Sequence, residues 1–359
     1  MTVTSFFSGW SCWRISSHRW AIRHPHRILT IGKDYSLPSN VTQRMSDLSE
    51  SRFGPMLSAV IRAFEEGNNM AQSVYRAFPD LTADEILTLI NLSYDRQAGD
   101  YIKLARLDMN RTRAWGDQLA DCIRPLLPAE GGSVLEVGVG EATSLAQVLH
   151  NLGTRVREAY GLDVSHSRIL HAKLWLRENH LDSNLFVADI SSIPLASNSV
   201  DVVYSSHSLE PNRGREKALM EECLRVARVG VVLIEPIYEL ADEAEKAHMD
   251  AHNYARGLWD IAQTLPAEIV AYRRLELYDA PNPKGVLALQ KYQPESLPAK
   301  IQGPQWECPI SGNSMTDSGS FFSVESIGIA YPVLSSIPLL ARRNSVVASA
   351  LVAGMGEAS

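Results

Sequence analysis

The sequence predicts an α/β fold built on a mainly parallel, doubly wound sheet of seven strands. Three observations support this prediction. From residue 133 onward short apolar runs alternate with helical patterns, the first apolar run ends in a glycine-rich turn, and two extended runs joined by a proline-rich turn close the series. Strands separated by helices of this length imply right-handed crossovers, and the final pair indicates a terminal antiparallel hairpin.

Composition limits the class of protein. The chain has 359 residues and a formal net charge of -7, with 45% hydrophobic and 21% charged residues. This is typical of a folded soluble protein, and the acidic balance makes nucleic acid an unexpected partner. The apolar stretches are too short or too interrupted to predict a membrane span. The four cysteines lie far apart without a paired motif, so we expect a reducing compartment, the cytoplasm.

Residues 1–44 form a basic extension unlike the rest of the chain. They hold six lysines and arginines against one acid, with three tryptophans and many serines. The composition resembles a transit peptide. A disordered tail and a segment upstream of a start at Met45 are the alternatives, and this extension is left out of the fold prediction.

Residues 45–114 are predicted to form a helical N-terminal cap. Thr82 and Glu85 have the spacing of a capping box and precede an amphipathic run. A further helix is expected at about residues 111–126, ending in a glycine-rich stop at residues 128–132.

The next region, residues 115–293, is predicted to be the sheet domain. Strands are expected at residues 133–139, 157–164, 183–190, 199–208 and 229–236, helices at 143–153, 167–180 and 215–227, and the terminal hairpin at 268–279 and 285–293. A proline-containing linker, residues 294–304, leads to a small C-terminal appendage, residues 305–359, which is too short for a large core of its own.

The stretch "VLEVGVGEAT" places a carboxylate and two glycines at a strand-to-helix turn. Glycines there let a ligand approach the backbone, and the following helix offers free N–H groups. The dinucleotide fingerprint G-x-G-x-x-G fits poorly, because Thr143 stands at its third glycine. A nicotinamide-dependent oxidoreductase is therefore disfavoured.

Five ordered motifs identify a family. They are "LEVGVGEAT", "GLDVS", "LFVADI", "SVDVVYSSHSLEPN" and "VGVVLIEPIYE". Together they resemble the class I S-adenosylmethionine-dependent methyltransferases, particularly the type 11 group, over about residues 115–292. The resemblance implies a Rossmann-like fold and S-adenosyl-L-methionine as the cofactor.

The resemblance also implies which residues bind the cofactor. The turn from Glu136 through Gly138 and Gly140 would carry its amino acid portion, and Asp163 would accept hydrogen bonds from the ribose hydroxyls, which suits an acceptor-only carboxylate. The remaining predicted contacts are Asp189 and the Ile190 backbone at the adenine and Ser206 facing the methyl group. Each of the three acids could instead have a purely structural role. Glu136 could be a buried acid with its own hydrogen-bond partners, Asp163 could cap the following helix, and Asp189 could begin a turn.

His207 and Glu210 are the candidate catalytic residues, in the loop after the fourth strand. Histidine has a pKa suited to a general base. Family members often have a histidine directly after this glutamate, but here Pro211 occupies that position. The alternative is that His207 lines the cofactor pocket without moving a proton.

Four residues after the fifth strand are expected to contact the acceptor: Glu235, Tyr238, Tyr254 and Arg256. His248 and His252 have a spacing that could hold a metal, yet the glutamate of the H-E-x-x-H motif is missing between them. We therefore predict no metal there and interpret this segment as a solvated or acceptor-facing helix.

The appendage resembles the small zinc-binding domains that accompany or activate some methyltransferases. Ser311 stands where the cysteine partner of Cys308 belongs, and no cysteine follows. A four-ligand zinc site cannot be built from it. We interpret the appendage as a metal-free remnant that packs on the catalytic domain or on a protein partner, a homo-oligomer included.

The function predicted from the sequence is methyl transfer to the oxygen, nitrogen or carbon of a small molecule, such as a metabolite, sugar or quinone-like compound. The alternative is an inactive cofactor-binding scaffold, permitted by the altered "LEPN" loop. Only the appendage hints at an RNA acceptor, against the acidic charge balance.

Overall fold

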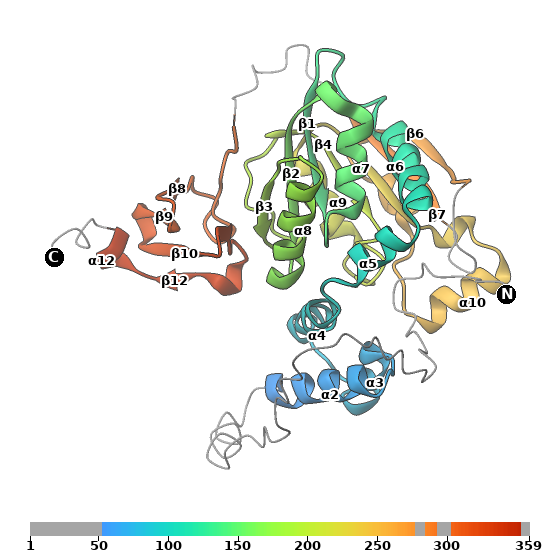
Figure 1. Cartoon of the computed structure of the whole chain (residues 1–359), viewed down its shortest axis with the longest axis horizontal. Helices are drawn as coiled ribbons and strands as arrows, with labels where there is room; N and C mark the ends of the chain where they lie inside the picture. Colours follow the sequence, from blue (N-terminus) through green and yellow to red (C-terminus); the bar gives the residue numbers. More distant parts are fainter. Residues whose placement is uncertain (1–51, 277–283, 293–302, 353–359) are drawn as a thin grey trace, which may run out of the picture. The chain divides into compact units, whose positions relative to one another are not determined.

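The computed structural model describes residues 52–276, 284–292 and 303–352 (Figure 1). The predicted basic extension, residues 1–44, and most of the predicted linker lie outside these residues. Contacts divide the described chain into two compact units, one ending at Arg96 and one beginning at Gln97. The domain boundaries predicted from the sequence stay predictions.

Between residues 52 and 96, the described part of the first unit, lie the helices α2 (Phe53–Glu65), α3 (Met70–Ala77) and α4 (Ala83–Arg96). Their apolar faces meet in a small core of their own. The capping box is present at α4: the Thr82 N–H donates to Glu85 Oε2 at 2.8 Å, and the Glu85 N–H donates to Thr82 Oγ1 at 3.3 Å. Two otherwise unsatisfied backbone donors are paired in this way, which explains why α4 begins there.

The second unit is built on a seven-stranded sheet with the order β3-β2-β1-β4-β5-β7-β6. Its strands are β1 (Gly132–Val137), β2 (Val156–Asp163), β3 (Asn184–Val187), β4 (Val200–Ser206), β5 (Ala227–Pro236), β6 (Ala267–Arg274) and β7 (Lys284–Lys291). The first five are parallel, and β7 runs antiparallel to both β5 and β6. The predicted mixed sheet with its terminal hairpin is confirmed.

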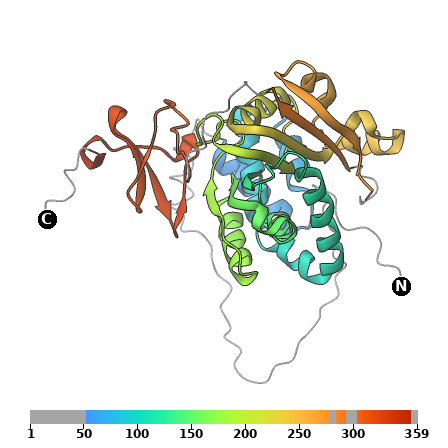
Figure 2. The same cartoon turned by 90° about the horizontal axis from the view of Figure 1, so that it is seen from above.

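Helices cover both faces of this sheet, as Figure 2 shows. They are α5 (Asp100–Leu107), α6 (Met109–Ile123), α7 (Thr143–Leu152), α8 (His166–Glu178), α9 (Glu216–Val226), α10 (Glu243–Ala251) and α11 (Leu258–Ala262). Side chains alternate along each strand, so Val134 joins the core beneath α6, α7 and α8, whereas Leu135 joins the core beneath α9 and α11. Every residue of β1 is buried, as a central parallel strand requires.

Helix α6 packs very closely on α7. A methyl group added at Gly116 would lie 2.1 Å from Gln147 Cβ, so only glycine allows this approach. The close packing brings the neighbouring Trp115 to the edge where the parallel strands end, where its ring centroid lies 5.9 Å from that of His207.

The C-terminal appendage forms a second, antiparallel sheet. It contains β8 (Thr316–Asp317), β9 (Phe321–Val324), β10 (Ile329–Leu334), β11 (Ile337–Pro338) and β12 (Val346–Val347), followed by α12 (Ser349–Val352). Its buried side chains, among them Phe322, Tyr331 and Leu340, are continuous with the core of the large sheet. The appendage therefore packs on the sheet domain rather than standing alone.

Two negative findings concern the described residues. Among residues 52–276, 284–292 and 303–352, no group of three or more histidine, cysteine and acidic side chains could hold a metal ion. Within the same ranges no helix is long and apolar enough to cross a membrane.

Candidate functional site

The site lies at the edge of the sheet where β1 to β5 end. Because β7 runs in the opposite direction, its first residue, Lys284, pairs with Pro236 at the end of β5 and reaches the same edge. Ligands of open α/β sheets bind at this edge. Residues from both ends of the sheet domain are thereby brought together.

The glycine turn after β1 is shaped by packing as well as by backbone conformation. Gly138 has φ of +69°, and a Cβ there would lie 2.2 Å from Ser208 Cβ in the loop after β4. The Ser208 hydroxyl donates to the Val137 carbonyl at 2.7 Å. Gly138 is therefore required by the approach of another loop, a reason that the motif by itself did not reveal.

Asp163 at the end of β2 is held by the backbone. Its two carboxylate oxygens accept from the N–H groups of Ser165, at 2.9 Å, and Gly140, at 3.0 Å. Burial raises the pKa of Asp163, while the nearby Arg168 and these hydrogen bonds act in the opposite direction. A carboxylate has about four lone-pair sites, so Asp163 keeps capacity to accept from a ligand hydroxyl.

Glu136 lies inside β1 and is 2% exposed. The Tyr204 hydroxyl donates to its Oε2 at 2.9 Å, and burial raises its pKa to about 8. The buried acid considered from the sequence is thus present, with a tyrosine as partner. Its predicted contact to the cofactor stays a prediction.

Asp189 follows β3 and forms an ion pair with Arg215, at 3.2 Å, while accepting from the Ser191 N–H at 2.9 Å. This local hydrogen bond is the turn contact considered from the sequence. Ile190 beside it is buried, and Ser206 ends β4 in register with Ile234 of β5. All three lie near the predicted ligand edge.

His207 and Glu210 form a hydrogen-bonded pair, with 3.1 Å between His207 Nδ1 and Glu210 Oε2. Burial lowers the pKa of His207 and raises that of Glu210 to about 8, so the pair resists carrying charge. His207 Nε2 and Glu210 Oε1 are both shielded from solvent and make no hydrogen bond to any described residue. Buried polar atoms are nearly always paired, so this pair has capacity for a further partner.

Glu235 fixes the loop that carries this pair. Its carboxylate accepts from the backbone N–H groups of Ser208, Leu209 and Glu210 at 3.0 to 3.3 Å. Burial raises its pKa to about 7. These contacts support a role for Glu235 in positioning the loop of His207 and Glu210. The predicted contact of Glu235 with the acceptor stays a prediction.

The other predicted acceptor residues differ in exposure. Tyr254 is fully buried, with its ring 5.7 Å from that of His252. Arg256 forms an ion pair with Asp250, and its guanidinium lies 4.2 Å from the centroid of the Tyr238 ring. The structure therefore brings Tyr238 and Arg256 together as a stacked pair and places Tyr254 in the core.

Sequence reasoning missed Lys284 and Trp115. Lys284 is 6% exposed, and its Nζ lies 4.3 Å from the centroid of the Trp115 ring. Burial lowers the pKa of Lys284 to about 7, with Arg111 lowering it further and Glu210 raising it. Nothing in the sequence could indicate this contact, because the two residues are brought together only by the antiparallel return of β7.

Glu141 was also missed, although it directly follows the glycines. Its buried carboxylate accepts from the N–H groups of Gly99, at 2.9 Å, and Ile102, at 2.8 Å. It thereby caps the N-terminus of α5 and ties that helix to the glycine turn. An acid beside a glycine turn was the available signal, but its partner could not be identified from the sequence.

The residues fit the implied cofactor. Two observations test this fit. Asp163 is buried, accepts from the Gly140 N–H and keeps capacity to accept from a ligand. A Cβ added at Gly140 would have only the Arg168 guanidinium within 4 Å, so the turn is open on that side. This is the chemistry that a ribose diol and an adjoining charged group require.

Comparisons with known proteins agree with this arrangement. A family model described as "Methyltransferase domain" matches residues 135–234, from β1 to β5, and so includes Glu136, Asp163, Asp189, His207 and Glu210. The comparison with curated proteins gives no match.

Solved structures with a similar chain include several methyltransferases. Magnesium protoporphyrin IX methyltransferase from Synechocystis PCC 6803, with bound S-adenosylhomocysteine, is 13% identical, covering 58% of this chain and 100% of that one, with a TM-score of 0.43. A methyltransferase from Aquifex aeolicus is 16% identical (48% and 89% covered, TM-score 0.36). A complex of the Haloferax volcanii Trm112 activator and a methyltransferase gives 13% identity (54% and 96%, TM-score 0.40).

The family match covers the strands and turns that carry the predicted cofactor residues. Residues 135–234 of this chain are therefore identified as a methyltransferase domain.

Proposed function

We propose that this protein transfers the methyl group of S-adenosylmethionine to a small molecule bound beside His207, Glu210, Trp115 and Lys284. One observation carries the proposal: His207 Nε2 and Glu210 Oε1 are buried without a hydrogen bond to any described residue, at the ligand edge of the sheet. A methyl acceptor whose hydroxyl or amine groups reach both atoms would satisfy them.

Glu136, Gly138, Gly140, Asp163 and Asp189 would hold the cofactor, with the Ile190 backbone and Ser206 beside them. The bound cofactor supplies a methyl group activated by a sulfonium. Since the reaction is a displacement, the protein has chiefly to align the nucleophile and exclude water. Burial of the His207–Glu210 pair supports both tasks.

His207 would take the proton from an acceptor hydroxyl or amine. This role requires a hydrogen on Nδ1 and a free lone pair on Nε2. Such a tautomer is favoured when Glu210 is ionised and accepts from Nδ1. The raised pKa of Glu210, about 8, would therefore control when the base is competent.

Lys284 and Trp115 would recognise the acceptor itself. A buried ammonium beside an aromatic ring suits a planar molecule with a negative or strongly dipolar oxygen. The ammonium would stabilise the oxygen anion formed as the proton leaves. Tyr238 and Arg256 are proposed as further acceptor contacts from outside this buried set.

The reducing compartment expected for the protein agrees with the free thiols of Cys122, Cys223 and Cys308. We propose the cytoplasm as its location and no nucleic-acid partner, on the acidic charge balance. A protein partner at the appendage stays a proposal.

Calorimetric titration of S-adenosylmethionine tests the cofactor assignment, with NADH as comparator. The parent should bind, and Asp163→Ala should bind about 1–3 kcal/mol more weakly because hydrogen bonds to a charged group are lost. Asp260→Ala, at another aspartate of the domain, is the matched control. Absence of binding by folded parent protein would overturn the assignment. An acceptor screen follows, and binding without turnover of any acceptor would favour the inactive scaffold.

A further inference from the structure

The loop after β3, residues 188–196, is named here the Asp189 loop. It carries the residue assigned to the adenine end of the cofactor, and the C-terminal appendage contacts it at its beginning, middle and end. We propose that the appendage is a positioning element of the cofactor site, which holds the Asp189 loop in its binding conformation. The inference rests on the proposed cofactor role of Asp189.

The beginning of the loop is held by β11 and the residues after it. Val187, the last residue of β3, forms a parallel bridge with Leu339, and the Leu340 N–H donates to the Val187 carbonyl at 2.8 Å. The appendage thus extends the edge of the large sheet at β3 by one parallel bridge. This pairing fixes where the Asp189 loop leaves the sheet.

The end of the loop is held by the first residues of the appendage. The Glu307 N–H donates to the Pro194 carbonyl at 3.1 Å, and the Ala196 N–H donates to the Gln305 carbonyl at 2.9 Å. Between these bonds Trp306 packs edge-on against Phe186 of β3, with 5.2 Å between ring centroids. Backbone pairing and an aromatic contact therefore act together here.

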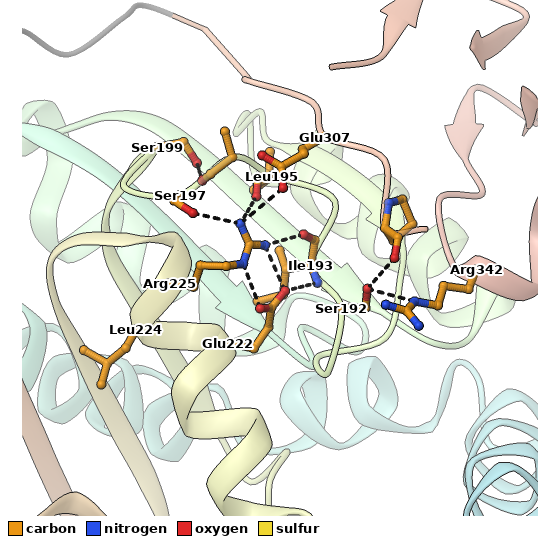
Figure 3. Close-up of polar contacts among 12 residues, drawn as sticks. Ser192, Ile193, Leu195, Ser197, Ser199, Glu222, Leu224, Arg225, Glu307 and Arg342 are labelled. Atoms are coloured by element: carbon orange, nitrogen blue, oxygen red, sulfur yellow. Dashed lines mark hydrogen bonds and ion pairs between the residues drawn. The ribbon is translucent and has the colours of Figure 1, made fainter. Parts of the chain in front are cut away.

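Ser192, in the middle of the loop, contacts two segments of the appendage that are far apart in sequence (Figure 3). Its hydroxyl donates to the Pro309 carbonyl and accepts from Arg342 Nε, each at 3.2 Å. The next residue, Arg343, donates to the Val164 carbonyl at 3.2 Å, directly after Asp163. The appendage consequently reaches both predicted adenosine-binding acids through the residues beside them.

Helix α9 supports the loop from the other side. Figure 3 shows Arg225 and Glu222 beneath the loop: the Ile193 N–H donates to Glu222 at 2.7 Å, and Arg225 donates to the carbonyls of Ile193 and Leu195, each at 2.9 Å. Arg225 also lies 3.7 Å from Glu307 of the appendage. The loop therefore lies between α9 and the appendage and is hydrogen-bonded to both.

A loop held in advance does not have to be ordered when the ligand binds, so preorganisation raises affinity without adding a contact to the ligand. Residues of the appendage would then affect cofactor affinity through the Asp189 loop. They are positioning residues in this proposal.

The test uses the full chain with Ser192→Ala, which removes both hydroxyl contacts, and Arg342→Ala, which removes one. Ser192→Thr keeps a hydroxyl and serves as the conservative variant. Arg273→Ala, an exposed arginine on β6 at the opposite edge of the sheet, is the charge-matched control for Arg342→Ala. Three quantities are measured: the Kd for S-adenosylhomocysteine, amide hydrogen exchange without ligand, and the Tm.

We expect Ser192→Ala and Arg342→Ala to weaken S-adenosylhomocysteine binding by about three- to tenfold, the scale of one or two hydrogen bonds. The amides of Ser191 to Leu195 should exchange faster, while those of β1 do not change. Ser192→Thr and Arg273→Ala should behave as the parent does.

Three results would contradict the proposal or limit it. An unchanged Kd and unchanged exchange in the loop, in folded variants, would overturn the positioning role. The second result is that exchange rises in the variants while the parent itself binds no S-adenosylhomocysteine. In that case the appendage does order the Asp189 loop, but the proposed function is wrong, and with it the cofactor role of the appendage. A lower Tm with an unchanged Kd would reduce the appendage to a stabilising part.

Discussion

The two ends of the site are built differently. At the cofactor end, Asp163 is held by backbone N–H groups within two residues of itself and from the neighbouring glycine turn. At the acceptor end, His207 and Glu210 meet Trp115 and Lys284, which come from distant parts of the chain. The comparison shows that a residue proposed to bind the cofactor is held by local contacts, whereas the residues proposed to bind the acceptor meet only through long-range packing.

The proposed acceptor end also holds two buried atoms, His207 Nε2 and Glu210 Oε1, that make no hydrogen bond to any described residue. Burial shifts the pKa values of His207, Glu210, Glu235 and Lys284 toward their neutral forms. A region with several buried titratable groups costs stability and is retained where chemistry needs it. The following predictions test this difference, from the largest expected effect to the smallest.

Replacing His207 should separate the two ends most clearly. His207→Asn keeps a residue that tolerates the positive φ of 59° and removes the base. With any acceptor that turns over, we expect kcat to fall about 10²- to 10⁴-fold, because general-base assistance is lost. The Kd for S-adenosylmethionine should not change. A matching fall in cofactor affinity would show that His207 belongs to the cofactor end.

Gly138 joins the two ends, and Gly138→Ala should damage both. The added Cβ meets Ser208 Cβ at 2.2 Å, and alanine at φ of +69° is strained. We expect the free energy of unfolding to fall by about 2–4 kcal/mol in urea denaturation. Gly214→Ala is the matched control, since its φ is +87° but nothing lies within 4 Å. Equal losses of unfolding free energy in the two variants would mean that only the backbone strain of alanine at positive φ matters, and that the contact with Ser208 does not.

Glu210 should make stability depend on pH. The folded protein keeps the Glu210 proton up to a pKa of about 8, whereas the unfolded chain releases it near 4.5. Its contribution is therefore fully present below about pH 4.5 and is lost as pH rises through about 8. In Glu210→Gln the decline across this window should be smaller by roughly 1–3 kcal/mol. Parallel curves of unfolding free energy against pH for parent and variant would contradict this.

Lys284 should act in the opposite direction, with the smallest effect. Its folded pKa of about 7 lies below the unfolded value of 10.5, so its cost is fully present below pH 7 and disappears as pH rises toward 10.5. Lys284→Met should therefore stabilise the protein by about 1 kcal/mol at pH 6, and less at pH 9. The KM for the acceptor should rise, while cofactor affinity stays constant. A destabilised variant at pH 6 would show that the contacts of the Lys284 side chain outweigh the cost of burying its charge.

Much of the fold followed from the sequence. The strands of the sheet, the capping box of Thr82 and Glu85, the helix ending at Gly153 and the terminal hairpin are local patterns, and the structure contains each of them. The places of the proposed cofactor acids followed from the sequence for the same reason, because Glu136, Asp163 and Asp189 lie within, at the end of or just after apolar strands. Parallel strands then bring their ends to one edge without further information.

What the sequence could not determine is which distant residues share that edge. The antiparallel return of β7 places Lys284 beside Trp115, and the close α6–α7 contact at Gly116 decides where that tryptophan lies. The same holds for the appendage, whose Arg342 reaches Ser192 where Leu339 bridges to Val187 at the end of β3. Local propensity and periodicity determine elements and their order, whereas contacts far apart in the chain depend on packing of the whole unit, which only the tertiary structure decides.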